Sequence, residues 1–243
     1  MSLAPNYISS VGVEMEGGIR WIDLETIRRK YNPTDRYDDG HDGSVHVSNP
    51  SDYYDWVDDV EIKYWSYDIN DVLQFGKDVW NSGFKQNSTC GNHHHFRFQN
   101  HELIITEVIA SKEFIEMFQR EFLEKYYARE KYYKRIDSRW CKFYHVSDDK
   151  WLNDQIIGNW YLGDRYRAVN FRSLVDYQKT LEIRIMPFAQ NYFEWRSQLL
   201  FNYNTINKII NILLTNRELK LEIDIGTIED IDISPLTPEE GVV

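Results

Sequence analysis

Four short segments of the chain alternate apolar residues with polar residues that can bind metals or phosphate. They cover residues 12–16, 60–63, 90–97 and 181–185. Because successive side chains of a strand point to opposite faces, the polar side chains of each segment share one face. The shared sets are Glu14 with Glu16, Glu61 with Lys63, His93 with His95 and Arg97, and Glu182 with Arg184. The pattern predicts a sheet with one apolar face and one face of carboxylates, imidazoles and guanidiniums.

The remaining pattern predicts the other elements. Strands are expected over 10–17, 44–48, 58–66, 90–98, 165–172 and 180–186, with loop and turn over 31–43. Helices are expected from an Asp68 cap to about Trp80, over most of 101–135, and over 192–214. Within 101–135, an aromatic stripe recurs every four residues and is typical of core packing: Phe114, Phe118, Phe122 and Tyr126. Paired strands between helices of unequal length predict an α+β domain, with helices backing a mainly antiparallel sheet.

Composition narrows the class of protein. We expect one domain over residues 1–215 and an acidic C-terminal extension over 216–243. The net charge of −11, from 28 basic and 39 acidic residues, argues against binding a nucleic-acid backbone. No charged-then-apolar leader and no apolar run of about 18 residues is present, so neither export nor membrane insertion is expected. Two cysteines are too few for a disulfide framework, and a cytoplasmic location is predicted.

Glu14 and Glu16 are the first candidate site. Two carboxylates on an exposed strand face are common and need no ligand. Here Gly12, Gly17 and Gly18 leave room for close approach of a ligand or of backbone. Glutamate oxygens suit Mg²⁺ or Mn²⁺, particularly when phosphate completes the coordination shell.

His93 and His95 are the second candidate. His94 must point to the other face of the strand. Two histidines on one face, followed by Arg97, favour metal or phosphate binding about as strongly as ordinary packing. Cys90 falls on the face opposite His93, which makes a single tetrahedral zinc site awkward and predicts a small buried residue instead.

Three further groups are weaker alone. Glu182 and Arg184 are either separate surface charges or a metal ligand beside a phosphoryl-binding arginine. Asp42-Gly43-Ser44 is by itself an ordinary turn that enters a strand. Arg167 and Asn170 lie on the strand before Glu182, but their parity differs, so the pattern does not place both at one site.

Six motifs follow one another in order along the chain: Gly12-Val13-Glu14-Met15-Glu16, Asp42-Gly43-Ser44, Val60-Glu61-Ile62, Cys90-Gly91-Asn92-His93-His94-His95, Tyr166-Arg167-Ala168-Val169-Asn170 and Thr180-Leu181-Glu182-Ile183-Arg184. With this set, from about residue 11 to about residue 200, the chain resembles the amidoligase family. That family belongs to the carboxylate–amine ligase superfamily, with glutamine synthetase and glutamate–cysteine ligase. Asn92 and His94 replace residues that are usually apolar there, so the far side of this strand is expected to be less buried or the strand distorted.

The resemblance implies a curved, mainly antiparallel sheet with helices on its outer face, as in the catalytic domain of glutamine synthetase. ATP would bind on the other face with Mg²⁺ or Mn²⁺. The implied metal ligands are Glu14, Glu16, Glu61, His93 and Glu182. His95 and Arg97 would contact the nucleotide, and Arg184 the transferring phosphoryl group. Arg167 and Asn170 would bind phosphate or the substrate carboxylate, and Asp42 would handle substrate or a proton.

The implied activity is an ATP-dependent ligase that joins a small-molecule or peptide carboxylate to an amine through an acyl phosphate. Other functions stay open: a phosphotransferase on the same scaffold, a metal-dependent hydrolase with zinc at His93, His95 and the glutamates, and a non-catalytic binding protein. The irregular segments 31–41 and 137–163 are expected to shape the substrate pocket.

Overall fold

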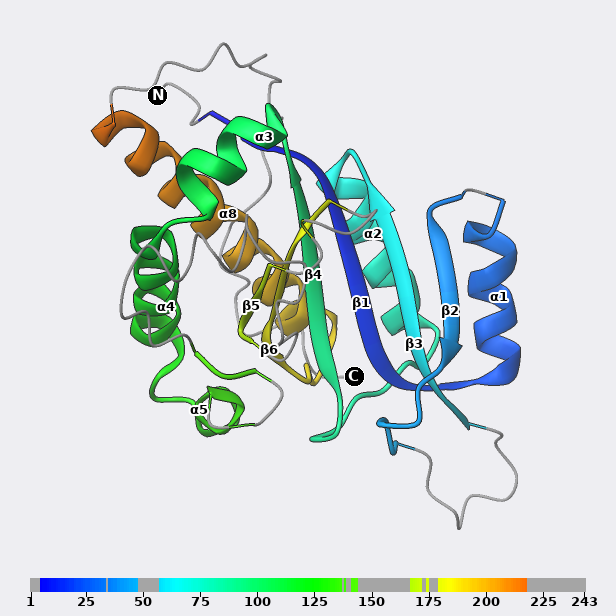
Figure 1. Ribbon diagram of the computed structural model, residues 1–243. Helices are drawn as coiled ribbons and strands as arrows, with labels where there is room; N and C mark the ends of the chain where they lie inside the picture. The colour runs from blue at the N-terminus through cyan, green and yellow to red at the C-terminus, as the bar shows by residue number, and fades with distance from the viewer. Residues whose placement is uncertain are drawn as a thin grey trace, which may run out of the picture.

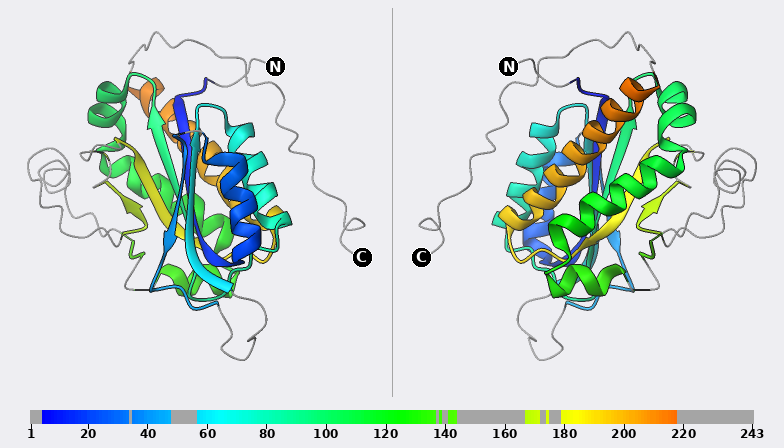
Figure 2. Two further views of the ribbon diagram at one scale, coloured as in Figure 1. Left: turned by 90° about the vertical axis from the view of Figure 1, so that its right-hand side faces the viewer. Right: turned by 90° about the vertical axis from the view of Figure 1, so that its left-hand side faces the viewer.

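The computed structural model describes residues 5–33, 35–47, 57–136, 138, 141–143, 167–171, 174 and 179–217. Within these residues the fold is α+β, with a six-stranded, fully antiparallel open sheet in the order β2-β3-β1-β4-β6-β5. The strands are β1 (Ile8–Arg20), β2 (Tyr37–His41), β3 (Val57–Ser66), β4 (Gly91–Phe98), β5 (Val169–Asn170) and β6 (Leu181–Pro187). Figure 1 looks onto one face of this sheet, and Figure 2 shows the helices gathered on the opposite face.

The helices are α1 (Trp21–Tyr31), α2 (Ile69–Asn81), α3 (His101–Ile104), the π-helical turn η1 (Ile105–Ile109), α4 (Lys112–Tyr126), α5 (Glu130–Ile136) and α8 (Tyr192–Asn216). The predicted cap of α2 is confirmed, because the Asp68 side chain accepts a hydrogen bond from the backbone N–H of Asn70. The predicted aromatic stripe of α4 is buried, and Phe118 and Phe122 meet Phe201 of α8. The stripe is core packing, as its spacing predicts.

The alternation of β1 explains why the helices cover one face only. Val11, Val13 and Met15 are buried toward the helical layer. Their partners across the sheet include Tyr64 and Ile62 of β3, so the apolar face is continuous. Burial of this face is the main source of stability, and it leaves the glutamates of β1 on the opposite face.

Two predictions in the segment 31–48 are wrong. Residues 37–41 form strand β2 rather than loop, because they pair with β3 from Tyr37 opposite Tyr64 to His41 opposite Val60. Residues 44–47, predicted as a strand, form none. Their backbone N–H groups bond instead to turn and side-chain oxygens: Ser44 to Asp42 Oδ1, Val45 to the Asp42 carbonyl, His46 to Thr89 Oγ1 and Val47 to Asp59 Oδ1.

The polar residues on the helix-facing side of β4 are fully buried, contrary to the expectation of a less buried side. Asn92 Nδ2 donates to Gln198 Oε1 of α8 at 2.9 Å, and Asn202 Nδ2 of α8 lies 2.8 Å from His94 Nδ1. The alternative expectation of a distorted strand is confirmed, since the register between β4 and β6 shifts between Asn92 and His94. Hydrogen bonds to α8 therefore replace apolar packing at these positions.

The predicted strand over 165–172 is shorter where the structure describes it, because only Val169 and Asn170 pair with β6. Most of segment 137–163 and residues 218–243 of the predicted extension lie outside the described residues. Among the described helices, none combines the length and the apolar character needed to cross a membrane.

Candidate functional site

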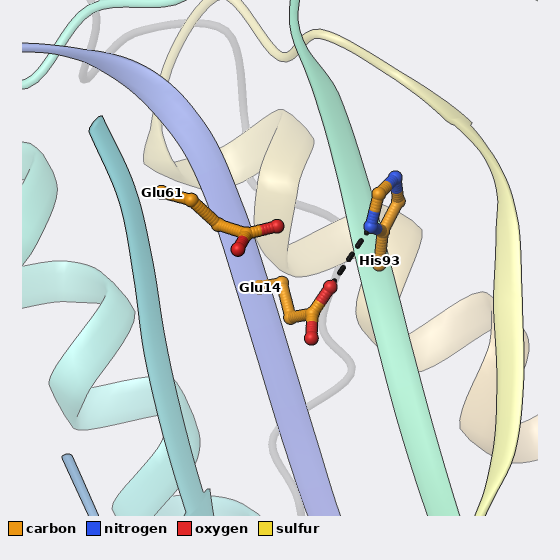
Figure 3. A group of neighbouring side chains, drawn as sticks. All are labelled: Glu14, Glu61 and His93. Carbon is orange, nitrogen blue, oxygen red and sulfur yellow. Dashed lines mark hydrogen bonds and ion pairs between the residues drawn. The ribbon is translucent and has the colours of Figure 1, made fainter. Parts of the chain in front are cut away.

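Acidic and imidazole side chains from four strands converge on the sheet face that the described helices leave uncovered. The register places Glu14 of β1 opposite His93 of β4 and opposite Lys63 of β3. Glu16 lies opposite Glu61. Figure 3 shows Glu14, Glu61 and His93 turned toward one another above the strands. We call Glu14, Glu16, Glu61, His93, His95 and Glu182 the carboxylate–imidazole cluster.

Glu14 lies at the centre of this cluster. Its Oε2 atom is 3.0 Å from His93 Nδ1, and its Oε1 atom is 3.3 Å from His95 Nε2. His93 also reaches outward, with Nε2 3.5 Å from Glu16 Oε1 and Nδ1 3.6 Å from Glu182 Oε1. One buried imidazole therefore lies among three carboxylates, each supplied by a predicted metal ligand.

Two cations balance part of the negative charge, and a neutral amide donates a further hydrogen bond. Lys63 Nζ lies 2.6 Å from Glu61 Oε2 and 3.6 Å from Glu14 Oε1. Arg184 Nη1 donates to Glu182 Oε1 at 2.5 Å, and Asn170 Nδ2 donates to Glu182 Oε2 at 2.5 Å. Clustered carboxylates without nearby positive charge would be costly, and Lys63 and Arg184 offset part of that cost. The strand alternation predicts Lys63 on the same face as Glu61, but the sequence alone suggests no role for it.

The cluster shifts the pKa values of its members in opposite directions. Burial alone would raise the pKa of Glu14, but hydrogen bonds from His93 and His95 lower it. The pKa of Glu182 is lowered for a similar reason, since His95, His93 and Arg184 outweigh its burial. Burial and the charge of Glu14 raise the pKa of Glu61. Burial would lower the pKa of His95, whereas its bond to Glu14 and the charge of Glu182 raise it. The charged forms of Glu14 and Glu182 are thus stabilised by their neighbours, whereas the neutral form of Glu61 is favoured.

The donor atoms of the cluster fit divalent cations. Three sets of ligand atoms each lie within 4.8 Å of one another: Glu14, Glu61 and His93; Glu14, His95 and Glu182; and Glu16, Asp42 and Glu61. The buried Nε2 atoms of His93 and His95 lie within ion-pair distance of carboxylates but have no partner in hydrogen-bond geometry. Carboxylate oxygens suit Mg²⁺ and Mn²⁺, whereas imidazole nitrogens suit zinc and other transition metals.

A pocket of about 380 Å³ adjoins the cluster. Glu14 and His95 form its border with the cluster, and Gly12 forms part of its floor. Its other lining residues include the following side chains: Arg36, Tyr37, Asp38, Lys63, Trp65, Arg97 and Thr180. Segment 31–41 therefore lines a pocket through Arg36, Tyr37 and Asp38, and Arg97 lines the same pocket as His95.

The other predicted site residues are placed as follows. Asp42 accepts hydrogen bonds from the N–H and the hydroxyl of Ser44, and its carboxylate still lies close to Glu16 and Glu61. Asn170 joins the cluster through Glu182. Arg167 donates from Nη1 to the backbone carbonyl of Phe143 at 3.3 Å. Arg167 and Asn170, which the strand alternation puts on opposite faces, therefore bind different partners.

His94 resembles a ligand in the raw sequence but faces away from the cluster, as predicted, and Cys90 is the small buried residue that the sequence predicts. His94 lies in the helical layer, where burial and the neighbouring histidines lower its pKa to about 3. Cys90 is buried, and burial raises its pKa to about 11. Thr180 was not recognised as a site residue, although its hydroxyl lies 3.0 Å from His95 Nδ1 and orients that ring. The only available signal was its position two residues before Glu182.

Comparisons with known protein families, with curated proteins and with solved structures find no match to this chain. The functional assignment therefore depends on the geometry of the cluster and on the ordered motifs.

Proposed function

We propose that this protein is an ATP-dependent carboxylate–amine ligase that requires Mg²⁺ or Mn²⁺. The observation that carries the proposal is the convergence of four glutamates and two histidines from separate strands beside a pocket of about 380 Å³. The cluster has the donor atoms for more than one divalent cation, and the pocket supplies cationic and aromatic side chains for a nucleotide. The order of the six motifs supports the choice of reaction.

The proposed metal ligands are Glu14, Glu16, Glu61, His93 and Glu182. Divalent ions held there would neutralise the phosphate charge of ATP. His95 is oriented by Thr180 and borders the pocket, so it is placed to contact the nucleotide. Arg184 is held by Glu182 and presents a fixed positive charge where the transferred phosphoryl group gathers negative charge.

In the proposed reaction, a carboxylate oxygen of the acid substrate attacks the γ-phosphorus of ATP. The bond from that phosphorus to the bridging oxygen breaks, giving an acyl phosphate and ADP. An amine then attacks the acyl carbon, inorganic phosphate leaves, and the amine loses a proton. In this proposal the carboxylate of Asp42, which lies close to Glu16, accepts the proton. Such chemistry needs positioning and charge neutralisation rather than a protein nucleophile.

Calorimetric titration of ATP, in the presence of Mn²⁺, tests the proposal. We expect saturable binding by the unaltered protein and a loss of affinity of about tenfold or more for Glu16→Gln, which keeps the shape but removes the charge. Glu116→Gln is the matched control, because Glu116 is exposed on α4, within the helical layer. Absence of ATP binding, or equal affinities of the Glu16 and Glu116 variants, would refute the proposal.

Hydroxylamine trapping separates the ligase from a phosphotransferase on the same scaffold. An acyl phosphate reacts with hydroxylamine to give a hydroxamate, whereas phosphorylation of a nitrogen gives none. A metal-dependent hydrolase would instead turn over without ATP and hold zinc tightly, which elemental analysis would detect.

A further inference from the structure

We propose that Arg135 of α5 forms a carboxylate-binding subsite above Gly91, at the Glu16 end of the cluster. The geometry around Gly91 supports the subsite independently of any reaction. Its assignment to the acid substrate rests on the proposed ligase function.

Helix α5 is fixed firmly against the sheet and α8, although it has only seven residues. Tyr132 stacks on Tyr126 with ring centroids 4.1 Å apart, and its hydroxyl accepts a hydrogen bond from Gln198 Nε2 at 3.0 Å. Lys131 Nζ lies 2.6 Å from Glu194 Oε1 and donates to the Phe188 carbonyl at 3.2 Å. Arg135 follows these residues by three and four positions, so it projects from the same side of a held helix.

The guanidinium of Arg135 occupies the space above Gly91. A Cβ atom at Gly91 would lie only 2.2 Å from Arg135 Nη2, so the absence of a side chain there makes room for the guanidinium. The same position is 3.3 Å from Glu16 Oε2, and Oε2 accepts a hydrogen bond from the Gly91 N–H at 2.6 Å. Arg135 therefore lies at the edge of the proposed metal site.

Arg135 is positioned without a counter-ion among the described residues. No described carboxylate lies within ion-pair distance of its guanidinium. Its Nε atom is buried and has no hydrogen-bond partner. The residue as a whole is only half-buried, so its outer N–H groups can meet a ligand. The planar fork of arginine matches a carboxylate with two parallel hydrogen bonds. A bound carboxylate would supply the missing charge.

The location separates this subsite from the pocket. The pocket reaches the cluster at Glu14 and His95, whereas Arg135 lies beside Glu16 and Gly91. Glu14 and Glu16 are two residues apart on β1, a distance of about 6.6 Å along the strand. Within the proposed function, the nucleotide approaches from the pocket and the acid from the α5 end, with the metal ligands between them. A carboxylate held by Arg135 at that end lies on the side of the cluster away from the pocket.

Succinate serves as the probe, since it carries simple carboxylates and no other recognition group. Its binding is measured by saturation-transfer NMR at constant ionic strength, with and without Mg²⁺. We expect the unaltered protein to bind succinate and Arg135→Gln to lose at least tenfold in affinity. Arg135→Lys should be intermediate, because it keeps the charge but loses the fork. Gly91→Ala should weaken binding as much as Arg135→Gln, because the new methyl group displaces the guanidinium.

Arg129→Gln is the control, because Arg129 lies over the Tyr126 ring, 5.7 Å from its centroid, and not at the cluster. Thermal unfolding of each variant tests whether the fold is kept. If Gly91→Ala does not fold, Arg135→Gln still tests the subsite. Failure of the unaltered protein to bind succinate, or equal affinities for Arg135→Gln and Arg129→Gln, overturns the subsite. ATP titration of the same proteins keeps the two proposals apart. Arg135-dependent succinate binding without ATP binding refutes only the ligase function, and ATP binding without succinate binding refutes only the subsite.

Discussion

Gly76 gives a sharp prediction about how the helical layer packs. It lies in α2, where its missing side chain allows Trp195 of α8 to approach. A Cβ atom at Gly76 would lie 2.1 Å from Trp195 Cζ3, 2.2 Å from Cη2 and 2.8 Å from Cε3. Trp195 is fully buried, so its ring has no free space to move into. We therefore expect Gly76→Ala to destabilise the protein.

The magnitude follows from two opposing effects. Alanine is favoured over glycine inside a helix by about 1 kcal/mol. Carbon atoms normally stay about 3.5–4.0 Å apart, so the new methyl group overlaps two ring atoms by more than about 1 Å. Overpacking of a close-packed core costs about 1–3 kcal/mol and sometimes more. An overlap this deep belongs at the upper end of that range. The net loss in free energy of unfolding is then about 2 kcal/mol, or a fall in Tm of about 4–8 °C for a chain of this length.

Urea unfolding of Gly76→Ala, Trp195→Phe and the double variant measures the effect. Phenylalanine lacks the outer ring atoms that clash, so Gly76→Ala should cost less, or become favourable, in the Trp195→Phe background. A coupling free energy of about 1–3 kcal/mol between the two positions is expected. If Gly76→Ala were as stable as the unaltered protein, or if the two substitutions were additive, the close contact would not be a determinant of stability.

Three further substitutions test other parts of the fold. Burial would raise the pKa of Asp39, but hydrogen bonds from Arg28 lower it, so this carboxylate stabilises the folded state above the ordinary aspartate pKa of about 3.9. The stability difference between the unaltered protein and Asp39→Asn should be full at pH 7 and disappear as the pH falls through the folded-state pKa, measured by denaturant unfolding at each pH. Phe118→Ala should lower the free energy of unfolding by about 3–5 kcal/mol, because it opens a cavity at a fully buried ring, and a small shift of the urea midpoint would contradict this. Gln198→Met should lower the free energy of unfolding by about 2 kcal/mol, since the Asn92 amide and the Tyr132 hydroxyl each lose one buried hydrogen bond, and an unchanged Tm would show that their remaining partners suffice.

Strong periodicity made much of the sheet predictable. Strands β1, β3, β4 and β6 and helices α2 and α8 form within a few residues of their expected bounds. The side-chain parity of the strands correctly separated His93 and His95 from His94. Alternation fixes which face a side chain occupies once a strand forms, so these predictions needed no knowledge of the partners.

Features that depend on long-range contacts were not predictable. Tyr37-Asp38-Asp39-Gly40-His41 has the composition of a turn, and only pairing with β3 makes it a strand. Conversely, residues 44–47 resemble a strand, but side chains of Asp42, Asp59 and Thr89 bind their N–H groups. Within the site, the side-chain parity grouped the glutamates on one face. It could not predict that Glu14 of β1 would lie opposite His93 of the neighbouring strand β4. Arg135 carried no signal at all, because its relation to Glu16 arises from the docking of α5.

The buried hydrogen bonds between β4 and α8 have a further consequence for how the two layers are aligned. Asn92 and His94 are two residues apart on a strand, a distance of about 6.6 Å. Their partners Gln198 and Asn202 are four residues apart on a helix, a rise of about 6.0 Å. Because the two spacings are nearly equal, both hydrogen bonds can form at the same time only when α8 has one particular position along β4 and one rotation about its own axis. Sliding or turning the helix by a single residue would break both. His94 thus fixes how α8, the longest of the described helices, is aligned with the strand that carries His93 and His95 on its other face.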